Sequence, residues 1–345
     1  MSHVDLSPAR RLQTLVMLTL FLTFDLVLFG AFTRLTDSGL GCPDWPGCYG
    51  HASPVGAHSA IALAQSALPS GPVTHGKAWI EMLHRYLATG VGMLILSLTA
   101  LSWRMRRRTP ALPGLGWPLA LLFMVCLQGA FGAFTVTMKL FPAIVTLHLL
   151  GGLALLGMLS ALATHYHTRI NRPPAVQLST RQRVALAGTA VLLLVQVSLG
   201  AWVSTNYAVL ACQDFPACQG QWWPDMDWAN GFTLWRDLGM TGQGELLGFS
   251  ALTAIHFAHR LMAVLALGAL AALAWSWRQH PGLQRPARCL AGLAGLQLIT
   301  GLSNVVLGWP MVAALLHTGG AAGLTAVLTW GWALAHPPRL RTEAL

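Results

Sequence analysis

The chain has 345 residues, of which 54% are apolar and only 9% are charged, and its formal net charge is +10. Soluble domains carry about 25% charged residues, so this composition excludes an ordinary water-soluble protein and favours one whose solvent is lipid. The positive charge does not indicate a nucleic-acid-binding protein, because the arginines occur in short groups between long apolar stretches.

Eight apolar segments are long enough to cross a bilayer, which needs about 20 helical residues. The first follows Arg10 and Arg11 as a signal peptide would, but it is too long, contains Asp25 and lacks a small-residue cleavage site. We therefore expect it to remain as a helix, and we assign no role to Asp25. The predicted spans lie near residues 12–33, 79–103, 115–138, 142–165, 184–205, 249–277, 286–307 and 311–335.

The arginine groups predict the orientation of these spans. With eight spans, every such group and both termini fall on one side, which the positive-inside rule identifies as the cytoplasm. The long loops 34–78 and 206–248 fall on the outer side. We expect a multi-pass protein of a bacterial inner (plasma) membrane, or of its mitochondrial equivalent, with both termini cytoplasmic. The groups lie at residues 10–11, 104–108, 169–183, 278–288 and 339–341.

The chain repeats itself after about 170 residues. Four spans in each half is an even number, so both halves have the same orientation, related by a pseudo-twofold axis along the membrane normal. We predict an all-α integral membrane protein built as two tandem four-helix bundles, an N-terminal half of residues 1–170 and a C-terminal half of residues 171–345. The matching segments are 30–32 with 200–202, 42–48 with 212–218, 80–85 with 255–260, Gln128 with Gln297 and His148 with His317.

Four of the thirteen histidines share one depth in even-numbered spans, each about six residues into its helix, or roughly 10 Å below the outer boundary at about 1.5 Å per residue. A lone buried histidine is more often hydrogen-bonded to backbone, but four at one depth, in two pairs, indicate a binding site. Two neutral imidazoles facing each other suit the axial positions of haem iron. Zinc or copper usually takes further carboxylate or thiolate ligands. The pairs are His84 with His148 and His259 with His317.

Charged residues accompany these histidines. Glu81 precedes His84 by three residues and shares its helix face, whereas the second half has His256 at this position. Glu81 is either a carboxylate at the membrane interface or a proton-handling group beside a reacting haem. Arg85 and Arg260 follow the histidines, and they either bind haem propionates through paired hydrogen bonds or extend to the outer interface.

Each outer loop contains two cysteines separated by five residues, Cys42 with Cys48 and Cys212 with Cys218. The outer compartment is oxidising, so a disulfide within each loop is the first interpretation. Metal capture and a reducible redox relay are the alternatives.

As a set, these features resemble the haem A synthase family, in its bacterial form with cysteine-bearing outer loops. The resemblance covers nearly the whole chain and rests on the eight-helix duplication, Glu81-x-x-His84-Arg85, His259-Arg260, His148, His317 and the Gly-Leu-Gly-Cys-Pro run at 39–43. It implies an enzyme that oxidises the C8 methyl of haem O to a formyl group, through a hydroxylated intermediate. The product, haem A, serves terminal oxidases.

The resemblance also implies roles for residues. His259 and His317 would hold a haem b cofactor, His84 and His148 would be axial ligands of the substrate haem, and Glu81 would be catalytic. Both cysteine pairs would be disulfides, but mitochondrial members lack them, so a cysteine-based mechanism cannot be general. The implied partners are haem O, an external electron donor, the farnesyl-adding haem O synthase and membrane lipid, with no nucleic acid.

Two other function classes compete with this one. A b-type membrane cytochrome would pass electrons without modifying haem, and two identical halves would favour it. A haem carrier would need no buried acid. The difference between Glu81 and His256 favours one reactive site and one structural site.

Overall fold

The computed structural model describes residues 7–106, 114–174 and 176–336, and this part of the chain contains helices and no strand. Eight helices are long and apolar enough to cross a membrane, which confirms the predicted all-α membrane fold. They are α1 (Ser7–Leu35), α3 (His75–Arg106), α4 (Gly116–Thr137), α5 (Pro142–Asn171), α6 (Thr180–Thr205), α8 (Phe249–Trp277), α9 (Gln284–Val306) and α10 (Met311–Ala335).

The two long loops that contain the disulfides also include three short helical elements: α2 (His58–Ala67), the 3-10 turn η1 (Ala208–Leu210) and α7 (Trp228–Gly231). Helix boundaries follow local chemistry. Ser179 and Gln182 form a capping box that starts α6. Helix α5 continues to Asn171, past its expected end near residue 165, and His165 and Tyr166 at the start of this extension are buried.

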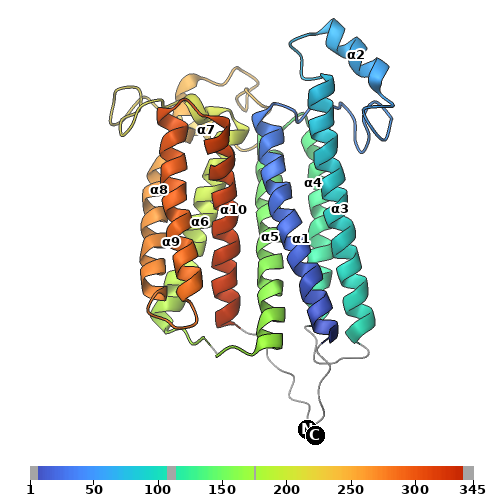
Figure 1. The fold of residues 1–345 in the computed structure, drawn as a ribbon. Coiled ribbons are helices and arrows are strands. Elements are labelled where there is room, and N and C mark those ends of the chain that lie inside the picture. The colour runs from blue at the N-terminus through green and yellow to red at the C-terminus, as the bar shows by residue number, and fades with distance from the viewer. Residues whose placement is uncertain (1–6, 107–113, 175, 337–345) are drawn as a thin grey trace.

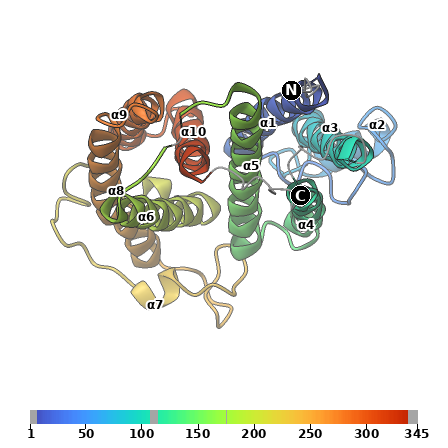
Figure 2. The same cartoon turned by 90° about the horizontal axis from the view of Figure 1, so that it is seen from below.

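The spans form two groups that stand side by side (Figure 1). In one group α1, α3, α4 and α5 contact one another in a ring, and in the other α6, α8, α9 and α10 do so in the same order. Viewed from below, the two groups lie next to each other, with α10 facing α5 where they meet (Figure 2). The common order is consistent with the predicted pseudo-twofold relation, and the division at residues 170 and 171 stays a prediction.

Each bundle is packed with apolar side chains at the end remote from the disulfide loops. Leu12, Ile95 and Leu159 belong to the core of the first bundle. Leu270 and Trp277 belong to the core of the second. The four intramembrane histidines lie toward the other end, beneath the loops.

Helix α1 begins and α10 ends at the end of the molecule opposite the disulfide loops (Figure 1). This is the relation expected for an even number of spans. The chain termini themselves, and the arginines at 107, 108, 339 and 341, lie outside the described residues.

Candidate haem sites

A glycine on the first helix of each bundle faces the histidine on the second. A methyl group added to Gly30 of α1 would lie 3.0 Å from Cε1 of His84. The same addition to Gly200 of α6 would lie 2.9 Å from Cε1 of His259. Both distances are tighter than ordinary van der Waals contact, so each imidazole occupies space that only a glycine leaves open.

The other two histidines repeat this arrangement less tightly. A methyl group on Gly132 of α4 would lie 3.5 Å from Cε1 of His148, and one on Gly301 of α9 would lie 3.3 Å from Cε1 of His317. The sequence contained these glycines but gave no sign of which side chain each one faces.

The histidine pair of the second bundle has the spacing of two axial haem ligands. The ring centroids of His259 and His317 are 6.4 Å apart, with planes 83° apart. Two imidazoles on one iron, each with a metal–nitrogen bond of about 2.0–2.1 Å, would place their ring centres roughly 6–6.5 Å apart. These residues therefore fit a haem iron between them.

Hydrogen bonds orient one of these ligands. Nδ1 of His317 is 3.0 Å from the hydroxyl of Thr300, and the side-chain amide of Gln297 donates to the His317 carbonyl at 2.7 Å. An imidazole held through Nδ1 has Nε2 free for a metal. Thr300 and Gln297 are thus outer-shell residues of the candidate site, and the sequence had indicated only Gln297, through its match with Gln128.

The first bundle carries a second candidate site around His84. Nδ1 of His84 is buried and has no hydrogen-bond partner among the described residues. The ring is stacked on Phe29, with centroids 6.2 Å apart and planes within 6°. Nδ1 of His148 and of His259 is unpaired in the same way, and because buried polar atoms are normally satisfied, these ring nitrogens are consistent with ligand-binding sites in both bundles.

Glu81 is a buried and fully engaged carboxylate. Only 4% of the surface of Glu81 is exposed to solvent. Oε2 accepts a hydrogen bond of 2.8 Å from the N–H of Cys42, and Oε1 forms an ion pair with Arg85. This burial argues against the alternative of an exposed interfacial carboxylate, and it joins Glu81 directly to the first disulfide.

His256 occupies the same position in the second bundle. Its Nδ1 is 3.4 Å from the N–H of Cys212, and its Nε2 is 3.4 Å from Nε of Arg260. The two halves therefore share one contact pattern, but an anionic group in the first is replaced by an imidazole in the second.

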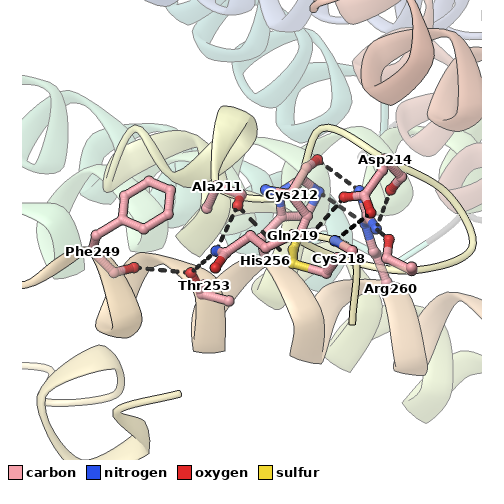
Figure 3. The surroundings of a disulfide bond; sticks show 11 residues. Ala211, Cys212, Asp214, Cys218, Gln219, Phe249, Thr253, His256 and Arg260 are labelled. Atoms are coloured by element: carbon pink, nitrogen blue, oxygen red, sulfur yellow. Dashed lines mark hydrogen bonds between the residues drawn. A yellow bond between two sulfur atoms is a disulfide. The ribbon is translucent and has the colours of Figure 1, made fainter. Parts of the chain in front are cut away.

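Arg85 and Arg260 bind the backbone of the disulfide loops. Nη1 of Arg85 donates to the carbonyls of Asp44 and Gly47, at 2.9 and 2.6 Å. In Figure 3, Arg260 lies under the second loop, where it donates to the carbonyls of Asp214 and Cys212 at 2.9 and 2.7 Å. The sequence had not indicated these partners. Binding of haem propionates by the same arginines stays a prediction.

Both cysteine pairs are disulfides, as predicted, with Cα–Cα distances of 4.9 Å for Cys42–Cys48 and 4.8 Å for Cys212–Cys218. All four cysteines are buried. The described residues contain no cluster of three metal-ligating side chains, so nothing in this part of the chain favours the metal-capture alternative.

An aspartate shapes each disulfide loop. The carboxylate of Asp214 accepts from the N–H groups of Gln219 and Gly220 at 2.7 and 2.8 Å. These bonds, the one from Gly220 first, lower the pKa of Asp214. Asp44 accepts from two N–H groups of the first loop in the same way.

The sequence of this chain is similar to a known protein family and to named bacterial proteins. The COX15-CtaA family, described as "Cytochrome oxidase assembly protein", matches residues 13–329. A protein of Shewanella oneidensis named "Heme A synthase" is 39% identical over 319 residues, which is 92% of this chain and 94% of that protein. Proteins of the same name from Rhizorhabdus wittichii and Sphingopyxis alaskensis are 28% and 31% identical, and cover 91% and 86% of this chain and 91% and 84% of their own lengths.

Proposed function

Because the chain belongs to the COX15-CtaA family of cytochrome oxidase assembly proteins, we propose that it catalyses the reaction named by its relatives, the conversion of haem O to haem A. It is a haem-modifying oxidoreductase of the membrane. The observation that carries the proposal is the inequality of its two histidine sites, one with the buried carboxylate Glu81 and the other with His256 in the same position.

The second bundle is proposed to hold haem b. The 6.4 Å between the rings of His259 and His317 supports this assignment, and Thr300 holds one ligand by Nδ1. When bound, haem b supplies one-electron transfer between an external donor and the reacting site. Gly200 and Gly301 leave the space that the imidazoles of His259 and His317 occupy.

The first bundle is proposed to receive haem O as substrate between His84 and His148. Oxidation of its methyl carbon to a formyl group involves proton transfer at the reacting site. Glu81 lies one helical turn from His84, and its buried carboxylate is available to exchange these protons. Its bonds to Arg85 and to the N–H of Cys42 fix its position and connect it to the outer loop.

The proposed setting is a bacterial inner membrane, with the disulfide loops outside and both termini in the cytoplasm. The oxidised cysteine pairs and the arginine groups on the opposite side support this orientation. An external electron donor and the haem O synthase are the proposed partners.

A b-type cytochrome is the second candidate function. The repeated contact of a glycine with each histidine favours it, because it makes the two sites alike. The contrast between Glu81 and His256 favours an enzyme.

Mass analysis of the extracted porphyrins separates the two functions. We expect the wild-type chain, supplied with haem O, to yield haem A or its hydroxylated intermediate. Glu81→Gln, which keeps the size of the side chain, should retain bound haem but form no formyl product. Glu245→Gln, in an exposed loop, is the matched control. Normal accumulation of haem A by Glu81→Gln would rule out the acid role, and only unmodified haem in the wild type would favour the cytochrome.

A further inference from the structure

A groove between α8 and α9 lies well away from the histidines, at the end of the molecule opposite the disulfide loops. Its volume is about 450 Å³. Small residues form much of its wall, among them Ala271 on α8 and Ala291 and Gly295 on α9. These residues lie in membrane-spanning segments, so the groove opens toward the hydrocarbon region of the bilayer.

Two arginines stand at one end of this apolar groove. Arg278 follows the last residue of α8 and Arg288 lies in the second turn of α9, so they approach from opposite walls. The guanidinium of Arg278 lies over the indole of Trp275, 3.1 Å from the ring centroid, which holds the cation at the mouth. No acidic residue lines the groove.

The dimensions match one leaflet of a membrane. From Arg288 to Leu298, the groove follows ten residues of α9, or about 15 Å of helix. Half of a hydrocarbon core of about 30 Å is the same length. The charged mouth is therefore at headgroup depth when the apolar wall is at acyl-chain depth.

We propose that this groove is a binding site for an anionic phospholipid. The headgroup phosphate lies between Arg278 and Arg288, and one acyl chain lies along the wall of small residues. Paired guanidinium groups at a membrane surface recognise lipid phosphate. A transmembrane helix of a second copy would fill the apolar wall but would leave the two cations unpaired. The farnesyl chain of a haem substrate would have to leave its porphyrin near the opposite face.

Native mass spectrometry of the full chain can test the site with phosphatidylglycerol and phosphatidylcholine of identical acyl chains. We expect retained phosphatidylglycerol in the wild type. The double variant Arg278→Gln with Arg288→Gln should lose at least about tenfold of this binding, since each basic residue contributes about fivefold. The control is the double variant Arg181→Gln with Arg183→Gln, which removes the same charge at the start of α6, at the same end of the molecule. It should retain the lipid.

A second pair of variants tests the apolar wall without altering charge. Gly295 lines the groove and Gly292 does not, and a Cβ added to either would meet no atom within 4 Å. Gly295→Leu should therefore displace the lipid, whereas Gly292→Leu should not. Three outcomes would overturn the proposal. The wild type could retain both lipids equally, or both arginine double variants could lose the lipid equally. The groove could also hold a farnesylated porphyrin or a second chain instead of lipid.

Discussion

Each of the four intramembrane histidines has a glycine as its neighbour across a helix interface. At Gly30, Gly200 and Gly301 an added methyl group would crowd the imidazole, so these glycines leave space that a larger residue would fill; at Gly132 the added group would make an ordinary contact at 3.5 Å. The space between glycine and imidazole is smallest at Gly200, where an added methyl group would lie 2.9 Å from Cε1 of His259.

Gly200→Ala should displace the imidazole of His259 and weaken haem binding by about 10–100-fold, the usual effect of disturbing the surroundings of a metal ligand. The measurement is haem content and the low-spin absorption spectrum of the purified protein. Gly188→Ala is the control on the same helix, because no atom lies within 4 Å of the added methyl group. If both variants retain the same haem content, the glycine does not position the ligand.

Removal of a proposed ligand should have a larger effect than displacement. His259→Ala and His317→Ala should each abolish the low-spin haem b spectrum, because one imidazole cannot hold six-coordinate iron alone. His280→Ala, outside the membrane-spanning helices, should leave the spectrum unchanged. An unaltered spectrum in His259→Ala would exclude the second bundle as the haem b site.

At the scale of elements, each disulfide loop is attached to a helix by a fixed set of contacts. An aspartate closes the loop on itself, and an arginine of the helix below holds the loop carbonyls. The arginine follows directly after a histidine, His84 or His259, that is proposed as a haem ligand. Movement of the loop is therefore linked mechanically to the helix that bears the ligand.

Asp214 should make the second loop sensitive to acid. Because its pKa is lowered in the folded loop, its ionised form stabilises that loop, fully above the ordinary carboxyl pKa of about 3.9 and progressively less as the pH falls below it. We expect acid to accelerate reduction of Cys212–Cys218 by a phosphine in the wild type. Asp214→Asn should make this reduction several-fold faster at pH 7 and should remove the acceleration in acid.

The control for this experiment is Asp225→Asn, an exposed aspartate of the same outer region. Phosphine reactivity itself changes with pH, so the two variants are compared at each pH. Equal reduction rates at pH 7 would show that the carboxylate does not hold the loop.

At the scale of the whole molecule, the two bundles are joined along α5 and α10. Ser160 donates to the carbonyl of Ala326 at 2.7 Å, and Gly157 faces Thr329 across the interface. At the end that carries the disulfide loops, Tyr207 donates to Asp37 at 2.9 Å, and these two residues are 170 positions apart, so they occupy equivalent places in the two halves.

Gly157→Leu should separate the bundles locally, because an added Cβ already lies 3.2 Å from Thr329. Overpacking of this kind costs about 1–3 kcal/mol, and it should lower the thermal unfolding temperature in detergent. Gly90→Leu on α3, where no atom lies within 4 Å of the Cβ, controls for the change in helix propensity. Equal unfolding temperatures would mean that the halves do not pack tightly at Gly157.

Composition, spacing and internal repetition by themselves determined the membrane class and the eight spans; they also made a disulfide the first interpretation of each cysteine pair and predicted four histidines at one depth. These properties can be read along the chain without knowing which helices meet, and the resemblance built on them identified the family. The contacts of Arg85 with loop carbonyls, the burial of Glu81 against Cys42, the facing glycines and the groove at Arg278 were decided only by the tertiary structure. The physical reason is that lipid is as apolar as a helix interface, so hydropathy shows that a segment crosses the membrane but not which of its faces meets another helix.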